Sequence, residues 1–139
     1  MADIAYRILI IDDDSFLLDM YSLKFKSVGH AVEVALGSEE GLAKLRAGFK
    51  PDIILSDIVM PGMDGFQLLE AIRNEKLAEG AVIIMLSNRG ERDDTDRAKR
   101  SGADAYIVKA RTIPSEVLEQ VLAVAGTRHT SVGTSPQTT

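Results

Sequence analysis

Residues 51–65 have the sequence PDIILSDIVMPGMDG, and this stretch decides how the rest of the chain can fold. The apolar run Ile53-Ile54-Leu55 has no polar alternation, which predicts a strand buried on both faces of a parallel sheet. Asp57 ends that strand, and a Pro61-Gly62 turn leads to Asp64, a residue type that caps helices. Ligands of open α/β sheets bind just outside the carboxyl ends of the strands. Asp57 is therefore the first candidate functional residue, although an aspartate at that place can also simply cap a loop.

Length and composition bound the class of protein. A chain of 139 residues predicts one domain, with a core large enough to be stable without disulfide bonds. The absence of cysteine excludes disulfides and thiolate metal sites, and a net charge of −5 argues against nucleic acid as the main partner. The longest apolar run, residues 81–86, is far too short to cross a membrane, and we see no signal peptide. We therefore expect a cytoplasmic protein.

Strand and helix patterns alternate five times along the chain. Strands are expected at residues 7–11, 31–35, 53–57, 81–86 and 103–108. Helices are expected at residues 15–28, from Ser38 to Gly48, from Asp64 to residue 73, at 90–101 and from Pro114 to residue 125. Such alternation predicts parallel strands joined by right-handed crossovers, and hence an α/β protein with a three-layer α/β/α sandwich. The domain is expected to span residues 1–125, and residues 126–139, half of them Ser and Thr, to form a disordered tail.

The helices carry specific expectations about caps and buried faces. In helix 15–28, Asp14 or Ser15 is expected to be the cap. Its buried face is expected to consist of Leu17, Tyr21, Phe25 and Val28. Ser38 is expected to cap the second helix. The segment 90–101 is polar on all sides, so we expect a weakly packed, solvent-exposed helix there.

Four of the five expected strands end on a polar residue. These residues are Asp12 with Asp13, Asp57, Ser87 and Lys109. Because the ends of parallel strands point the same way, we expect these side chains to gather at one edge of the sheet. Three crowded carboxylates repel one another, and Mg²⁺, which prefers oxygen ligands, removes that conflict. With a lysine and a hydroxyl to hold a phosphoryl group, Asp57 can attack phosphorus, so the set predicts phosphoryl transfer to or from a carboxylate.

Three motifs together resemble the receiver domains of two-component response regulators. They are ILIIDDD at residues 8–14, DIVMPGMDG at residues 57–65 and AKRSGADAYIVK at residues 98–109. The resemblance covers about residues 6–125 and is specific because the motifs occur in combination. It implies a flavodoxin-like fold with five helices and a five-stranded parallel sheet in the order 2-1-3-4-5. Receivers catalyse only their own phosphorylation and dephosphorylation, so the resemblance implies no conventional enzyme. Because we see no DNA-binding or catalytic domain after residue 125, we expect a stand-alone, CheY-like receiver.

The resemblance also implies a role for each site residue. Asp57 is the expected phosphoacceptor, and Mg²⁺ is the expected cofactor. The expected metal ligands are Asp57, Asp13, Asp12 mostly through water, and the backbone carbonyl of Val59. Ser87 is expected to bond the phosphoryl group and Lys109 to pair with it. Tyr106 is expected to be an aromatic switch that turns inward when Ser87 is drawn to the phosphoryl group.

The implied phosphodonor is a phosphohistidine on a sensor histidine kinase or on a histidine phosphotransfer protein. The implied output is the docking of a downstream protein partner on the face formed by helix 90–101, strand 103–108 and the helix from Pro114. We expect neither direct nucleic-acid contact nor membrane contact. A phosphoryl group carries roughly two negative charges, and nearby hydrogen-bond donors reorganise around it.

Two residues near the expected site depart from the family pattern. The family lysine is usually followed by a proline through a cis bond, but Ala110 follows Lys109 here. A cis bond before a non-proline residue costs about 3–4 kcal/mol, so we predict a trans bond and a rearranged loop. The residue after the hydroxyl is usually very small, whereas Asn88 can crowd the phosphoryl group or donate a hydrogen bond to it.

Two other functions fit parts of the sequence. A haloacid-dehalogenase-type phosphatase would use Asp12 as nucleophile and Asp14 as general acid, but Phe16 stands where that pattern needs threonine. A receiver-like binding module that is rarely or never phosphorylated is favoured by Asn88 and Ala110 alone. The identity of the aspartate that a phosphodonor labels discriminates the first alternative, and a failure of labelling in the presence of Mg²⁺ favours the second.

Overall fold

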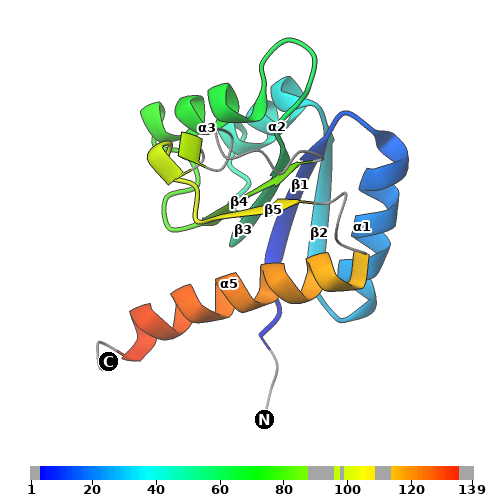
Figure 1. Ribbon diagram of the computed structural model, residues 1–139, viewed down its shortest axis with the longest axis vertical. Coiled ribbons are helices and arrows are strands. Elements are labelled where there is room, and N and C mark those ends of the chain that lie inside the picture. The colour runs from blue at the N-terminus through cyan, green and yellow to red at the C-terminus, as the bar shows by residue number, and fades with distance from the viewer. Residues whose placement is uncertain (1–3, 88–95, 98, 109–113, 135–139) are drawn as a thin grey trace.

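Five parallel strands form the central sheet (Figure 1). The computed structural model describes residues 4–87, 96–97, 99–108 and 114–134. The strands are β1 (Arg7–Asp12), β2 (Ala31–Leu36), β3 (Ile53–Asp57), β4 (Val82–Ser87) and β5 (Ala105–Val108). They pair in the order β2-β1-β3-β4-β5, which confirms the order implied by the family resemblance. The strand order changes direction beside β1, and α/β sheets bind ligands at such a point.

Helices cover both faces of this sheet (Figure 1). They are α1 (Ser15–Ser27), α2 (Ser38–Arg46), α3 (Gly65–Asn74) and α5 (Pro114–Thr134). Of the predicted helix 90–101, residues 96–97 and 99–100 are helical, residue 101 is in a turn, and the others lie outside the described residues. One hydrophobic core contains side chains of α1 and α5, and the other contains side chains of α2 and α3. The predicted three-layer α/β/α sandwich is therefore confirmed.

Successive residues of the inner strands pack into the two cores on opposite faces of the sheet. In β1, Ile8 and Ile10 pack with α1 and α5, whereas Leu9 and Ile11 pack with α2 and α3. All four side chains are fully buried. Side chains alternate across a strand, so a strand between two helical layers needs an apolar residue at every position. The unbroken apolar runs of the sequence thus match the inner strands of the sheet.

The buried face of α1 differs from the expected one by a shift in register. Asp14 is the N-cap, as expected, and Tyr21 and Phe25 are buried. Leu18 takes the buried position that was expected for Leu17, which is half-buried. Val28 is exposed, because the helix ends at Ser27 and the chain turns away at the next glycine, whose φ is +98°. Spacings of three and four between the buried residues keep them on one side of a 3.6-residue helix.

Ser38 is not the cap of α2, which corrects the sequence expectation. The N-cap is Gly37, and Ser38 is the first helical residue. The Ser38 hydroxyl donates a hydrogen bond to the backbone carbonyl of Met63 at 2.8 Å. This bond joins α2 to the turn that follows β3, whereas a cap would have used the hydroxyl within its own helix. Asp64 does cap α3, through a capping box that it forms with Gln67.

The last helix is longer than expected. The sequence predicts a disordered tail from residue 126, whereas α5 continues to Thr134. The first turns of α5 are anchored in the core by Val117, Val121 and Ala125. Lengthening an anchored helix adds one hydrogen bond for each residue fixed, so propagation is much easier than nucleation. Residues 135–139 of the predicted tail lie outside the described residues. Within the described part of the chain, no helix is long and apolar enough to cross a membrane.

His30 is a buried polar residue just before β2. Its ring Nδ1 accepts a hydrogen bond from the backbone N–H of Tyr6 at 3.0 Å, which ties the start of β1 to the start of β2. The ring also lies against Tyr6 and Phe25, with centroid distances of 5.4 and 6.4 Å. Burial lowers the pKa of His30 below its usual value. A proton on Nδ1 would face the N–H of Tyr6, so the fold requires the neutral ring.

Lowering the pH from about 7 to about 5 is expected to destabilise the protein in part through His30. The histidine of the unfolded chain titrates near 6.5, while the folded state resists protonation, so the unfolded state binds more protons below that pH. The free energy of unfolding then falls with falling pH, by at most about 1.4 kcal/mol per pH unit for this group. His30→Gln does not titrate and should show a shallower pH dependence in urea unfolding. Equal slopes for the two proteins would refute this.

Candidate functional site

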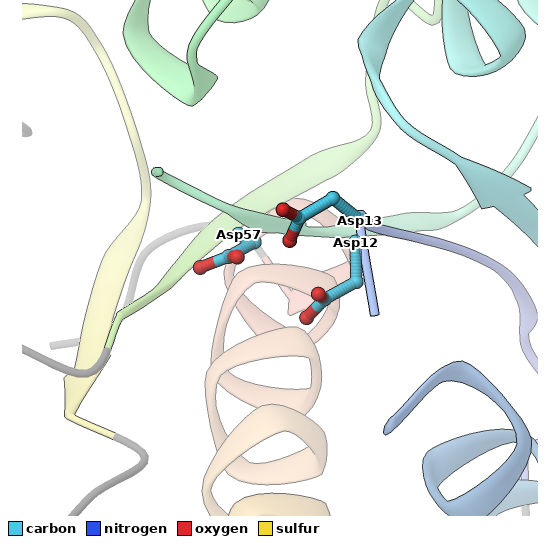
Figure 2. A group of neighbouring side chains, drawn as sticks. All are labelled: Asp12, Asp13 and Asp57. Carbon is cyan, nitrogen blue, oxygen red and sulfur yellow. The ribbon is translucent and has the colours of Figure 1, made fainter. Parts of the chain in front are cut away.

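Three aspartate carboxylates gather at the carboxyl ends of two adjacent strands. Asp12 is the last residue of β1, and Asp57 is the last residue of β3. The register pairs Ile11 with Ser56, so the two strand ends lie side by side. One carboxylate oxygen each of Asp12, Asp13 and Asp57 lies within 4.8 Å of the other two. Figure 2 shows the three side chains grouped together, as the sequence predicts.

The three carboxylates differ in their access to solvent. Asp12 is 2% exposed and Asp57 is 7% exposed, whereas Asp13 is exposed. Asp12 Oδ1 accepts a hydrogen bond from the backbone N–H of Asp14 at 2.9 Å. Asp57 Oδ1 accepts one from the backbone N–H of Ile58, also at 2.9 Å. Two carboxylates are thus oriented by backbone donors inside the fold, and the third, that of Asp13, is open to solvent.

The oxygen donors of this cluster fit a hard divalent cation. Like charges this close repel one another, and a bound cation offsets that repulsion. The three oxygens lie within 4.8 Å of one another, which brings all three carboxylates close enough to act on a single ion, directly or through water. Asp12, Asp13 and Asp57 are therefore the residues that could hold a metal.

The turn after β3 holds Asp57 in place through a close approach of α3. The backbone N–H of Gly65 donates a hydrogen bond to the carbonyl of Ile58 at 2.7 Å. A Cβ atom on Gly65 would lie 2.4 Å from the backbone oxygen of Asp57, and 2.8 Å from both Ile58 Cα and Met85 Cε. Only glycine therefore fits at the start of α3. Sequence reasoning did not single out Gly65, although a glycine directly after a helix cap was a usable signal.

The remaining predicted site residues occupy three different positions. Ser87 ends β4 and is 1% exposed, and the register pairs its neighbour Leu86 with Asp57, so Ser87 lies at the same sheet edge. Val59, two residues after Asp57, is 60% exposed. Tyr106 of β5 is half-buried and packs against the core of α2 and α3. The predictions for Lys109, Asn88 and Ala110, including the trans bond, lie outside the described residues.

Asp14 is committed to a structural role. Its carboxylate accepts hydrogen bonds from the backbone N–H groups of Phe16 at 2.9 Å and Leu17 at 3.4 Å. These bonds cap α1 and satisfy donors that the helix cannot pair internally. The phosphatase alternative needs Asp14 as a general acid for a substrate bound to Asp12. The observed capping geometry argues against that role.

Comparison with known proteins identifies the family. The family model for the response regulator receiver domain matches residues 8–122, which run from the second residue of β1 past the end of β5. The chain therefore belongs to the receiver domains of response regulators, the signalling modules of two-component systems. The acidic cluster at the sheet edge is compatible with magnesium binding in such a domain.

The individual relatives include longer regulators. The DNA-binding dual master transcriptional regulator RpaA of Synechocystis is 33% identical over 118 residues, which are 85% of this chain and 48% of RpaA. The transcriptional regulatory protein ResD of Bacillus subtilis is 34% identical over 119 residues, which are 85% of this chain and 47% of ResD. The chain thus spans about half the length of these curated relatives.

Solved structures of response regulators match over nearly the whole length of their chains. A CheY-like receiver domain protein from Methanospirillum hungatei has a TM-score of 0.81 and 32% identity, with 92% of this chain and 99% of that chain covered. The chemotaxis response regulator CheY4 of Vibrio cholerae has a TM-score of 0.79 and 29% identity, with 87% and 99% covered. Both matches agree with the flavodoxin-like sheet order described above.

Proposed function

We propose that this chain accepts a phosphoryl group on Asp57 from a phosphohistidine of a sensor histidine kinase or a histidine phosphotransfer protein. The observation that carries the proposal is the cluster of Asp57 with two further carboxylates within 4.8 Å, at the carboxyl edge of a receiver sheet. In the reaction, a carboxylate oxygen of Asp57 forms a bond to phosphorus while the bond from phosphorus to the donor nitrogen breaks. The product is an aspartyl phosphate, which an attacking water later hydrolyses.

Mg²⁺ is the proposed cofactor, and the chain's own oxygens are its proposed ligands. Asp13 binds it directly, in keeping with its exposed position, and Asp12 binds it mostly through water. Asp57 and the backbone carbonyl of Val59 complete the protein ligands. When bound, the ion supplies positive charge that offsets the charge of the phosphoryl oxygens. The backbone N–H of Ile58 meanwhile holds one Asp57 oxygen in a fixed direction.

Ser87, Lys109 and Tyr106 are proposed to convert phosphorylation into a change of shape. The Ser87 hydroxyl donates a hydrogen bond to the phosphoryl group, and Lys109 pairs with its charge. Movement of Ser87 lets Tyr106 turn further inward from its half-buried position. Ser87 is on β4 and Tyr106 is on β5, and these two strands are paired, with Met85 opposite Tyr106. The proposed movements of Ser87 and Tyr106 therefore occur on neighbouring strands.

The proposed output is the docking of a protein partner. The docking face consists of the segment 90–101, β5 and α5, and no direct contact with nucleic acid or membrane is involved. RpaA is named as DNA-binding, but this chain corresponds to only about half of its length. We propose a cytoplasmic receiver that switches partner binding through its own phosphorylation and dephosphorylation.

Incubation with Mg²⁺ and acetyl phosphate, a small phosphodonor, is expected to add one phosphoryl group to the protein. EDTA should prevent the addition because the cation offsets the repulsion among the carboxylates. Hydroxylamine should remove the group, since it cleaves acyl phosphates. Intact-mass spectrometry measures each step.

The opposite result would point to the non-phosphorylated binding module. If calorimetry shows Mg²⁺ binding but no condition adds a phosphoryl group, the proposal fails. In that case Asn88→Ala and Ala110→Pro, separately and together, would show whether the two departures from the family pattern are the cause.

A further inference from the structure

A cavity lies between α3 and the described residues 97 and 99–101. It has a volume of about 500 Å³, and its lining includes Phe66, Glu70, Arg73, Arg97 and Arg100. We call it the arginine groove. Figure 1 shows the short helical pieces formed by residues 96–97 and 99–100, in yellow, lying beside α3. None of the three site aspartates is among the described residues that line it.

The described residues that line the arginine groove carry more positive than negative charge, in a protein that is negatively charged overall. Among them are three arginines and one glutamate, while the whole chain carries a net charge of −5. Among the described residues, the two ion pairs are Lys44–Glu33 and Arg46–Glu75, and neither involves a groove arginine. The groove thus offers several strong donors that are not neutralised by a carboxylate within 4.0 Å in the described part of the chain.

Two of these arginines are held in position by contacts with the fold. The guanidinium carbon of Arg97 lies 4.3 Å from the centroid of the buried Phe66 ring, in a cation–π contact. Arg73 Nη2 donates a hydrogen bond to the carbonyl of Gly102 at 3.0 Å, which joins α3 to the end of the 97–101 segment. Side chains that are already ordered lose less entropy when they bind a ligand. The groove is therefore organised in advance, unlike a scatter of surface arginines.

We propose that the arginine groove binds a small organic anion that carries a phosphate group. Planar guanidinium groups match phosphate oxygens with paired hydrogen bonds, better than the point charge of a lysine does. A volume of about 500 Å³ is within the usual range for small-molecule sites and large enough for a mononucleotide. Glu70 supplies an acceptor for a hydroxyl or amino group of the same ligand. The site does not depend on phosphorylation of Asp57.

The test uses pyrophosphate and AMP as probes, with adenosine as the uncharged control. Each is titrated into the full-length protein in EDTA, which keeps metal away from the aspartate cluster. Amide chemical shifts in NMR spectra locate the binding. Pyrophosphate and AMP should shift the signals of Gln67, Ser101 and Gly102 more than those of Asp13 and Ile58, and adenosine should shift none of them.

Three variants distinguish a site from diffuse attraction. Arg97→Gln and Arg100→Gln should each weaken AMP binding by about tenfold or more, since each removes charge-assisted hydrogen bonds. Lys99→Gln removes the same charge from the same segment, but Lys99 does not line the groove, so binding should change by less than about twofold. Arg100→Gln leaves the contact between Arg97 and Phe66 intact. If the Arg97 variant folds poorly, the Arg100 variant therefore still tests the site.

Several results would overturn this proposal. No saturable shift with millimolar pyrophosphate or AMP would refute a phosphate site. If Lys99→Gln weakened AMP binding as much as the arginine variants do, the binding would depend on overall charge and not on a specific site. Shifts centred on Asp13 and Ile58 would assign the anion to the receiver site, and saturable binding of an acidic peptide without AMP binding would assign the groove to a protein partner.

Discussion

The Asp57→Asn variant is expected to gain no phosphoryl group from acetyl phosphate under conditions that label the wild type fully. The amide nitrogen is no nucleophile toward phosphorus, and the remaining amide oxygen carries no negative charge. The fold should persist, because that oxygen can still accept the hydrogen bond that Ile58 N donates to Asp57 at 2.9 Å. Intact-mass spectrometry gives the extent of labelling, and circular dichroism checks the fold.

Asp19→Asn is the matched control, because it makes the same chemical change at an exposed aspartate of α1. Its labelling should equal that of the wild type. The Asp12→Asn variant distinguishes a receiver from a phosphatase. If the protein is a receiver, any phosphoryl label that this variant still gains is on Asp57. If the label survived in Asp57→Asn and vanished in Asp12→Asn, Asp12 would be the nucleophile and the proposed function would be wrong.

Gly65→Ala is expected to be the most damaging single-methyl change near the site. Its Cβ would lie 2.4 Å from the Asp57 carbonyl oxygen and 2.8 Å from Ile58 Cα, and both of these are backbone atoms. Neither can move without displacing the strand end that carries Asp57. We expect a loss of about 3 kcal/mol in the free energy of unfolding, the upper end for overpacking. Phosphorylation should also slow at temperatures where the variant remains folded.

Gly126→Ala provides the comparison for this prediction. Gly126 lies in α5 without a positive φ, and an added Cβ there meets nothing within 4 Å. Alanine is the better helix former, so this variant should be stabilised by about 0.5–1 kcal/mol. Urea unfolding measures both. A Gly65→Ala protein with the stability and phosphorylation rate of the wild type would show that α3 does not pack tightly on the end of β3.

The apolar runs of the sequence are enough to predict the sheet and its functional edge. A strand covered on both faces must be apolar at every position, so β1, β3 and β4 stand out from the helical patterns around them. A polar residue at the end of such a run is also conspicuous. Asp12 and Asp57 were predicted to lie together on this basis, and the structure places them together. The two aspartates are close together because the carboxyl ends of parallel strands lie at the same edge of the sheet.

Caps and contacts between helices were less predictable, because they depend on residues far apart in the chain. The Ser38 hydroxyl could cap its own helix, but it bonds to the carbonyl of Met63 instead. Leu17 and Leu18 are equally apolar, and the direction from which the sheet approaches α1 decides which of them is buried. The continuation of α5 beyond residue 126 likewise follows from its anchoring in the core.

The sequence by itself determined the class of fold, the strand ends and the family, since these depend on local periodicity and on motifs of a few residues. Only the tertiary structure decided that residue 65 must be glycine, because α3 approaches the backbone of Asp57 there. It also brought Arg73 of α3 and Arg97 to one groove over Phe66. No local pattern carries such information, because packing depends on distances between segments that only the complete fold sets.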